Sequence, residues 1–141
     1  MVKTLLGRIR LLPDINSADK SSVAAAERQA VNSIIQGTAA DMIKLAMILS
    51  VEMIATLDKY ESNSPVGDDR CARLVMQIHD ELIFEVPDDA DYLAQFIARL
   101  KIIMEEKVVK RLNLCVPLVT NVSVGKRWGD VQAWSFTQPS G

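Results

Sequence analysis

The sequence predicts an α+β fold in which helices pack on one face of a small antiparallel sheet. A long segment from about Val23 to Leu57 repeats apolar residues at helical spacing. Two apolar runs flank three polar residues in "ARLVMQIHDELIFEV", which is the pattern of a β-hairpin. A second amphipathic helix pattern follows in "PDDADYLAQFIARLKIIMEEKVVKRL". Helices and strands that do not alternate regularly favour this class, and so few strands indicate only part of a sheet.

The size and charge of the chain limit its class. Its 141 residues suffice for one domain with a core, and 49% of them are hydrophobic. The net charge of -2 excludes a strongly basic, independent nucleic-acid binder, so any contact with DNA would use a local patch or a larger assembly. Cys71 and Cys115 have no partner at metal-ligand spacing. Without an apolar run of signal-peptide or membrane-span length, we expect a soluble, intracellular protein.

The N-terminal segment "TLLGRIRLLP" predicts a short strand or an extended arm that carries Arg8 and Arg10 and ends at Pro13. A polar connection follows, in which Ser21 or Ser22 is expected to cap the first helix.

The first helix has an apolar stripe that we expect to face the core. Its members are Val31, Ile34, Ile35, Met42, Ile43, Ala46, Leu49, Met53 and Ile54. Gly37 interrupts this pattern, so a kink or two successive helices are expected rather than one straight rod.

The remaining elements follow in order. "KYESNSPVGDDR" has the composition of a loop, and the hairpin comes next. The second helix begins with the acidic segment Pro87 to Asp91 and ends with basic Lys107, Lys110 and Arg111, which complements the helix dipole. "VPLVTNVSVG" alternates like a third strand, and the tail "KRWGDVQAWSFTQPSG" is expected to leave the fold and fray.

The hairpin tip carries the candidate chemistry. Asp80 and Glu81 are adjacent acids, and they repel each other unless a cation lies nearby. Magnesium is the natural candidate, because it binds a few carboxylates together with phosphate oxygens. A solvated turn is the alternative, and it is the commoner meaning of polar residues at such a tip. Gln77 favours a site slightly, because a plain core strand has no need of a glutamine.

A polar row on the first helix is a second candidate. Arg28, Asn32 and Gln36 stand four residues apart and share one face. Each can donate hydrogen bonds to the acceptors that every base pair presents in the minor groove. The alternative is a solvated helix face, although such faces more often carry Lys and Glu.

Taken together, these segments resemble the C-terminal part of family A DNA polymerases. "TLLGRIRLLPDI" is similar to the family's "TLFGRRRYLPDI" element, and "AAERQAVNSIIQGTAADMIKLAMI" to its "AERxAxNxxxQGxAADxxKxAM" block. "VMQIHDELIFEVP" resembles motif C with its "QxHDEL" core, and "PLVTNVSVGKRWGD" the closing strand with its G-x-x-W end. The resemblance extends from about Lys3 to Trp128, and it is nearest to the eukaryotic theta and nu branch.

The resemblance implies a template-directed DNA polymerase that uses two Mg²⁺ ions, with template-primer DNA and deoxynucleoside triphosphates as partners. Asp80 matches the catalytic metal-binding aspartate, and Glu81 matches its secondary acidic neighbour. His79 matches a contact to the primer terminus. Further DNA contacts are implied for Arg28, Asn32, Gln36, Arg8 and Arg10, although Ile9 stands where the family often has a third arginine.

No segment of the sequence resembles the family's motif A, its nucleotide-binding fingers helix or its thumb. We therefore interpret residues 1–141 as a single incomplete domain, part of the palm, that is unstable and inactive alone. It is a fragment of the enzyme or a subunit that a separate chain with motif A and fingers completes. The alternatives are a non-catalytic remnant that binds DNA or a partner and, remotely, an unrelated metal hydrolase. A theta-like protein would act in nuclear DNA repair, whereas a bacterial or phage protein would be cytoplasmic.

Overall fold

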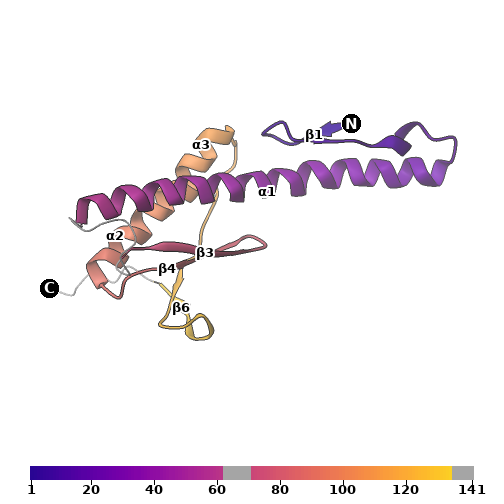
Figure 1. Ribbon diagram of the computed structural model, residues 1–141. Helices are drawn as coiled ribbons and strands as arrows, with labels where there is room; N and C mark the ends of the chain where they lie inside the picture. The colour runs from indigo at the N-terminus through magenta and orange to yellow at the C-terminus, as the bar shows by residue number, and fades with distance from the viewer. Residues whose placement is uncertain (62–70, 135–141) are drawn as a thin grey trace.

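The computed structural model describes residues 1–61 and 71–134, and it has the expected α+β class (Figure 1). These described residues form three small antiparallel sheets, each of two strands, together with one long helix and a second, composite helix. The pairs are β1 (Val2–Lys3) with β2 (Ile9–Arg10), β3 (Arg73–Ile78) with β4 (Glu81–Glu85), and β5 (Ser123–Val124) with β6 (Gln132–Ala133). The expected loop falls mostly on residues 62–70, which lie outside the described part. Within that part, no helix is long and apolar enough to cross a membrane.

Helix α1 (Lys20–Glu61) is one continuous helix of 42 residues that runs straight in Figure 1, so the expected kink or division into two helices at Gly37 is wrong. Gly37 serves a different purpose. A Cβ at this position would lie 2.5 Å from Cγ2 of Thr4, so a larger residue would force the N-terminal arm to shift away from the helix. The expected serine caps are also wrong. Asp19 precedes the helix and accepts hydrogen bonds from the amides of Ser21 and Ser22.

The N-terminal arm is a small hairpin, β1–β2, that runs along the N-terminal half of α1 (Figure 1). Gly7 has a φ of 83°, a left-handed conformation that glycine adopts without strain. The extended arm ends at Pro13, as expected, because this residue begins the short 3-10 helix η1 (Pro13–Asn16). The amide of Leu5 donates to Oγ1 of Thr38 across the contact with α1.

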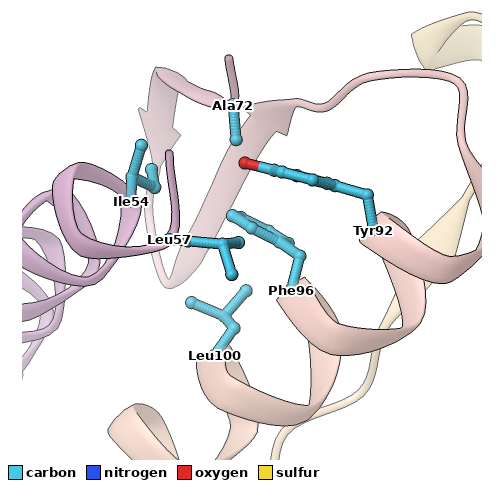
Figure 2. Close-up of a cluster of buried hydrophobic side chains, with 6 residues drawn as sticks. All are labelled: Ile54, Leu57, Ala72, Tyr92, Phe96 and Leu100. Carbon is cyan, nitrogen blue, oxygen red and sulfur yellow. The ribbon is translucent and has the colours of Figure 1, made fainter. Parts of the chain in front are cut away.

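The larger hydrophobic core lies where the C-terminal half of α1 meets β3, β4 and α2 (Ala90–Lys101). Figure 2 shows its buried members, which are Ile54, Leu57, Ala72, Tyr92, Phe96 and Leu100. Phe84 of β4 packs edge-on against Phe96, with ring centroids 5.4 Å apart. This core fixes the base of the β3–β4 hairpin.

The second helix is composite. α2 continues through the π-helical segment η2 (Ile102–Lys107) into α3 (Val108–Leu112). Its predicted acidic start is confirmed, since Asp89 caps the helix by accepting from the amide of Tyr92 at 2.8 Å. Glu105 of η2 accepts two hydrogen bonds from Thr120, which lower the pKa of this carboxyl.

A smaller core surrounds Ala46, Val108 and Leu112, where α3 packs against α1. Leu82 of β4 packs on its margin together with Met42. Ser50 is fully buried, and its hydroxyl donates a hydrogen bond to the carbonyl oxygen of Ala46. Because Ala46 and Ser50 are small, the two helices can approach closely here.

The C-terminal segment differs from the expectation. Within the described residues, Ser123–Val124 is the part of the predicted third strand that forms a strand, and its partner is β6 in the tail that was expected to fray. A Cβ on Gly125 would lie 2.5 Å from the carbonyl oxygen of Asp130, so a glycine is required for the chain to fold back. Trp128 begins the 3-10 helix η3 (Trp128–Asp130), and residues 135–141 lie outside the described part.

Candidate nucleic-acid interface

The β3–β4 hairpin presents the polar triplet at its turn, as the sequence predicts. Ile78 pairs with Glu81, so His79 and Asp80 form a two-residue loop and Glu81 is the first residue of β4. All three side chains of the triplet are exposed. Such a short loop fixes the position of Asp80 through the two strands that flank it.

His79 has a φ of 50°, which places it in the left-handed region. This conformation costs a residue with a Cβ about 1–2 kcal/mol, so neighbouring contacts must maintain it. One such contact is present: Nε2 of Gln77 donates to the carbonyl oxygen of His79 at 2.5 Å. The glutamine that stood out in the sequence is therefore part of the turn.

The carboxylates of Asp80 and Glu81 have no hydrogen bond or ion pair within the described residues. Carboxylate oxygens are the ligands that Mg²⁺ prefers, so the chemistry of the pair fits this ion. However, the described residues contain no group of three or more His, Cys, Asp or Glu side chains placed to hold a metal. Asp80 and Glu81 can therefore supply only part of a ligand set.

The polar row lies on a definite face of α1. Ala46, which is buried against α3, follows Arg28 by about five full turns, so the two residues point in the same direction. Gly37 lies about two and a half turns from each and faces the arm on the opposite side. Asn32 and Gln36 continue the row at steps of about one turn. The row thus extends, toward the N-terminus, the face that packs on the hairpin and α3.

On this face, none of the described segments covers the N-terminal half of α1. Arg28 and Asn32 are exposed and line a shallow hollow with Glu27, Val31 and Ile35. Val31 and Ile35 are 61% and 65% exposed, so their assignment to the core is wrong, as is that of Ile34. The stripe becomes a core only from about Met42 onward, where the hairpin and the second helix cover it.

The hairpin and the polar row approach each other along α1. Leu82 and Met42 both pack against the smaller core, and Figure 1 shows the β3–β4 turn pointing toward the N-terminal half of the helix. Gln36 precedes Met42 by about 9 Å of helix axis. The turn and the near end of the row therefore lie at similar levels on one side of α1.

Arg8 has a partner inside the chain. Its guanidinium donates to Oδ1 of buried Asp41 at 3.0–3.1 Å and to the carbonyl oxygen of Gly37 at 2.7 Å. This cluster joins the arm to α1, and the sequence analysis missed Asp41. The available signal was an acid four residues after a helical glycine. Arg10 is exposed on β2 and remains available to a partner.

Comparison with known proteins identifies the class of protein that has this fold and this site. Residues 1–130 match the family model for DNA polymerase family A. The chain is 42% identical over 129 residues to DNA polymerase theta of Drosophila melanogaster, covering 92% of this chain and 6% of the relative. It is 40% identical over 127 residues to the thermostable DNA polymerase I of Thermus aquaticus, covering 90% and 13%.

A solved structure agrees with these relatives. The POL domain of Pol1 from M. smegmatis, in complex with DNA primer-template and dNTP, matches with a TM-score of 0.60 and 35% sequence identity. The match covers 83% of this chain and 18% of that one. The chain therefore belongs to DNA polymerase family A, as its motifs predicted. It spans only a small part of the length of these relatives.

Proposed function

We propose that this chain forms the DNA-facing part of the palm in a DNA-directed DNA polymerase. The observation that carries the proposal is the two-residue turn that holds the exposed Asp80 between two paired strands. Membership of family A supports it, as does the solved relative that holds primer-template and dNTP. The reaction is attack of the primer 3′-hydroxyl on the α-phosphate of a deoxynucleotide, with pyrophosphate as the leaving group.

Asp80 is the proposed principal metal ligand, and Glu81 is a weaker or outer ligand. When bound, two Mg²⁺ ions would favour ionisation of the 3′-hydroxyl and neutralise the triphosphate. The part of this chain is to hold the Asp80 carboxylate at a fixed place, where it is exposed and has no partner among the described residues. The remaining ligands, including the motif A aspartate, would come from polypeptide beyond this sequence.

His79 and the polar row of α1 are the proposed DNA contacts. The row of Arg28, Asn32 and Gln36 offers donors along one side of the helix, at the height of the turn and beyond it. A duplex lying there would meet the row through its minor groove and would bring its primer end to the turn. Arg10 is free to add a phosphate contact, whereas Arg8 is engaged with Asp41.

The proposal includes a limit on the isolated chain. With a partial ligand set and no segment that resembles the fingers, residues 1–141 alone should not incorporate nucleotides. A longer form of the same polypeptide or a separate chain would complete the site. A role in nuclear DNA repair, if the protein is theta-like, or a cytoplasmic location, if it is bacterial or from a phage, stays a prediction.

Primer extension by the complete enzyme tests the proposal. Asp80→Ala should abolish incorporation while leaving DNA binding largely intact, because it removes a metal ligand from an exposed turn. Asp14→Ala, which removes an exposed acid from η1, is the matched control and should extend normally. Incorporation at the normal rate by Asp80→Ala would refute the metal assignment.

A non-catalytic remnant is the second candidate, and the partial ligand set favours it. The purified chain is assayed alone and then with a polypeptide that carries the motif A and fingers segments. Extension only in the mixture supports a divided or truncated polymerase. A folded chain that stays inactive in both assays supports the remnant.

A further inference from the structure

We infer that Gln77 is a positioning residue that fixes the direction in which the turn presents Asp80. The inference rests on the proposed metal-binding role of Asp80. It assigns to Gln77 an action through the backbone, without contact to substrate or metal.

The first step concerns the peptide unit between His79 and Asp80. In a two-residue hairpin loop this is the central peptide. The two common hairpin turns, types I′ and II′, differ mainly in the orientation of this peptide. Its carbonyl is the acceptor to which Nε2 of Gln77 donates at 2.5 Å. The hydrogen bond therefore selects one orientation of the peptide that leads directly into Asp80.

The second step concerns the residue at the first loop position. Hairpin turns with a positive φ at this position favour glycine, yet this chain has His79 there with a φ of 50°. Asp80, the second loop residue, has no positive φ. The Gln77 side chain stabilises this conformation by its hydrogen bond to the carbonyl of His79, whereas a glycine would adopt it without help. The turn can then keep a histidine beside the aspartate.

The third step connects the peptide to the ligand. The orientation of the central peptide sets the φ of Asp80 and therefore the direction of its Cα–Cβ bond. The Asp80 carboxylate has no partner of its own within the described residues, so its direction depends on the backbone. Loss of the Gln77 bond should thus act on metal binding, as outer-shell substitutions do.

The experiment uses the complete polymerase polypeptide and two variants. Gln77→Met keeps the length of the side chain and removes the donor, and Gln77→Asn keeps the amide but is too short to reach. Gln132→Met is the matched control, since Gln132 is an exposed strand glutamine in β6. The Mg²⁺ concentration for half-maximal primer extension is measured together with the thermal unfolding midpoint.

Both Gln77 variants should raise the Mg²⁺ requirement about 10-fold, with an unchanged KM for primer-template. Their unfolding midpoints should fall by a few degrees at most, because the lost hydrogen bond holds an exposed turn and adds little to the core. A purely stabilising role would lower the midpoint as well but leave the Mg²⁺ requirement unchanged. That result would overturn the inference.

Two measurements are independent of activity. Binding of Mn²⁺, followed by electron paramagnetic resonance, should weaken in Gln77→Met by about the same factor. Amide hydrogen exchange across the turn should accelerate without any metal. Adding His79→Gly to Gln77→Met should restore slow exchange and Mn²⁺ binding, because glycine adopts the turn unaided. Failure of this rescue would count against the mechanism.

The two proposals fail separately. If Asp80→Ala retains incorporation, the metal assignment itself falls. If Asp80→Ala is inactive but both Gln77 variants keep the normal Mg²⁺ requirement, only the positioning role is wrong.

Discussion

The two halves of α1 share one apolar pattern but have different surroundings. In the C-terminal half, Leu57 is 1% exposed, and the hairpin and α2 cover the helix on the same side. In the N-terminal half, the same side carries Arg28, Val31 and Ile35, all exposed. Among the described segments, the N-terminal arm covers this half, and it lies on the opposite side of the helix. Helical periodicity thus predicts which residues share a face, whereas the covering of that face depends on other segments.

The largest expected effect is a loss of packing in the C-terminal half. Leu57→Ala should lower the free energy of unfolding by about 2–5 kcal/mol, because it leaves a cavity between α1 and α2. Ile35→Ala in the other half should change it by less than about 0.5 kcal/mol. Urea denaturation of the purified chain measures both. Equal losses would mean that the N-terminal face is covered in solution.

The contact between the arm and α1 should contribute less. Arg8→Met would leave the buried carboxylate of Asp41 without its ion pair, at a cost of about 1–3 kcal/mol. This estimate takes into account that the Arg8 side chain is half-exposed and partly screened. Arg10→Met is the control and should be near neutral. A neutral Arg8→Met would show that the arm contributes little to stability.

Gly37 tests the same contact by size. Gly37→Ala adds a methyl group against Cγ2 of Thr4 and should destabilise the chain by about 1 kcal/mol, despite the better helix propensity of alanine. Combined with Thr4→Ser, which removes Cγ2, the same change should become stabilising by up to about 1 kcal/mol. Thermal unfolding detects the change of sign. If Gly37→Ala stabilises the chain without Thr4→Ser, the close approach is absent in solution.

The smallest effect on stability is expected in the polar row. Arg28→Ala and Gln36→Ala should alter the free energy of unfolding by less than about 0.5 kcal/mol, because both side chains are exposed. In the complete enzyme they should weaken extension from the primer end or mismatch discrimination. Normal extension and fidelity in both variants would argue against the minor-groove role.

Local patterns predicted much of the fold. The hairpin, the position of its turn and the acidic start of α2 are confirmed because each depends on residues adjacent in sequence. The expected kink or division at Gly37 was wrong. This glycine makes room for Thr4, which is distant in sequence. The pairing of β5 with β6 was missed for a similar reason. The strands are short, and a backbone contact between Gly125 and Asp130 brings them together.

The residues of the candidate site could be predicted from the sequence, but the hydrogen bonds that hold them in place could not. The motifs identified His79, Asp80 and Glu81, and the structure places them together at one turn. The internal roles of Arg8 and Gln77 could not be read from the sequence. Both depend on hydrogen bonds to backbone carbonyls, which are not encoded by residue type at a fixed spacing.

Strand β3 contains a register shift that constrains how this segment can vary. Leu74 pairs with Phe84 and Met76 with Ile83, so Val75 is an extra residue without a partner in β4. The shift puts Leu74 and Gln77 on one face of the hairpin, although an odd number of steps separates them. Deleting or inserting a single residue in β3 before Gln77 would move each following side chain, up to the turn, to the opposite face of the hairpin. Evolution can therefore exchange side chains in this strand far more easily than it can change the strand's length.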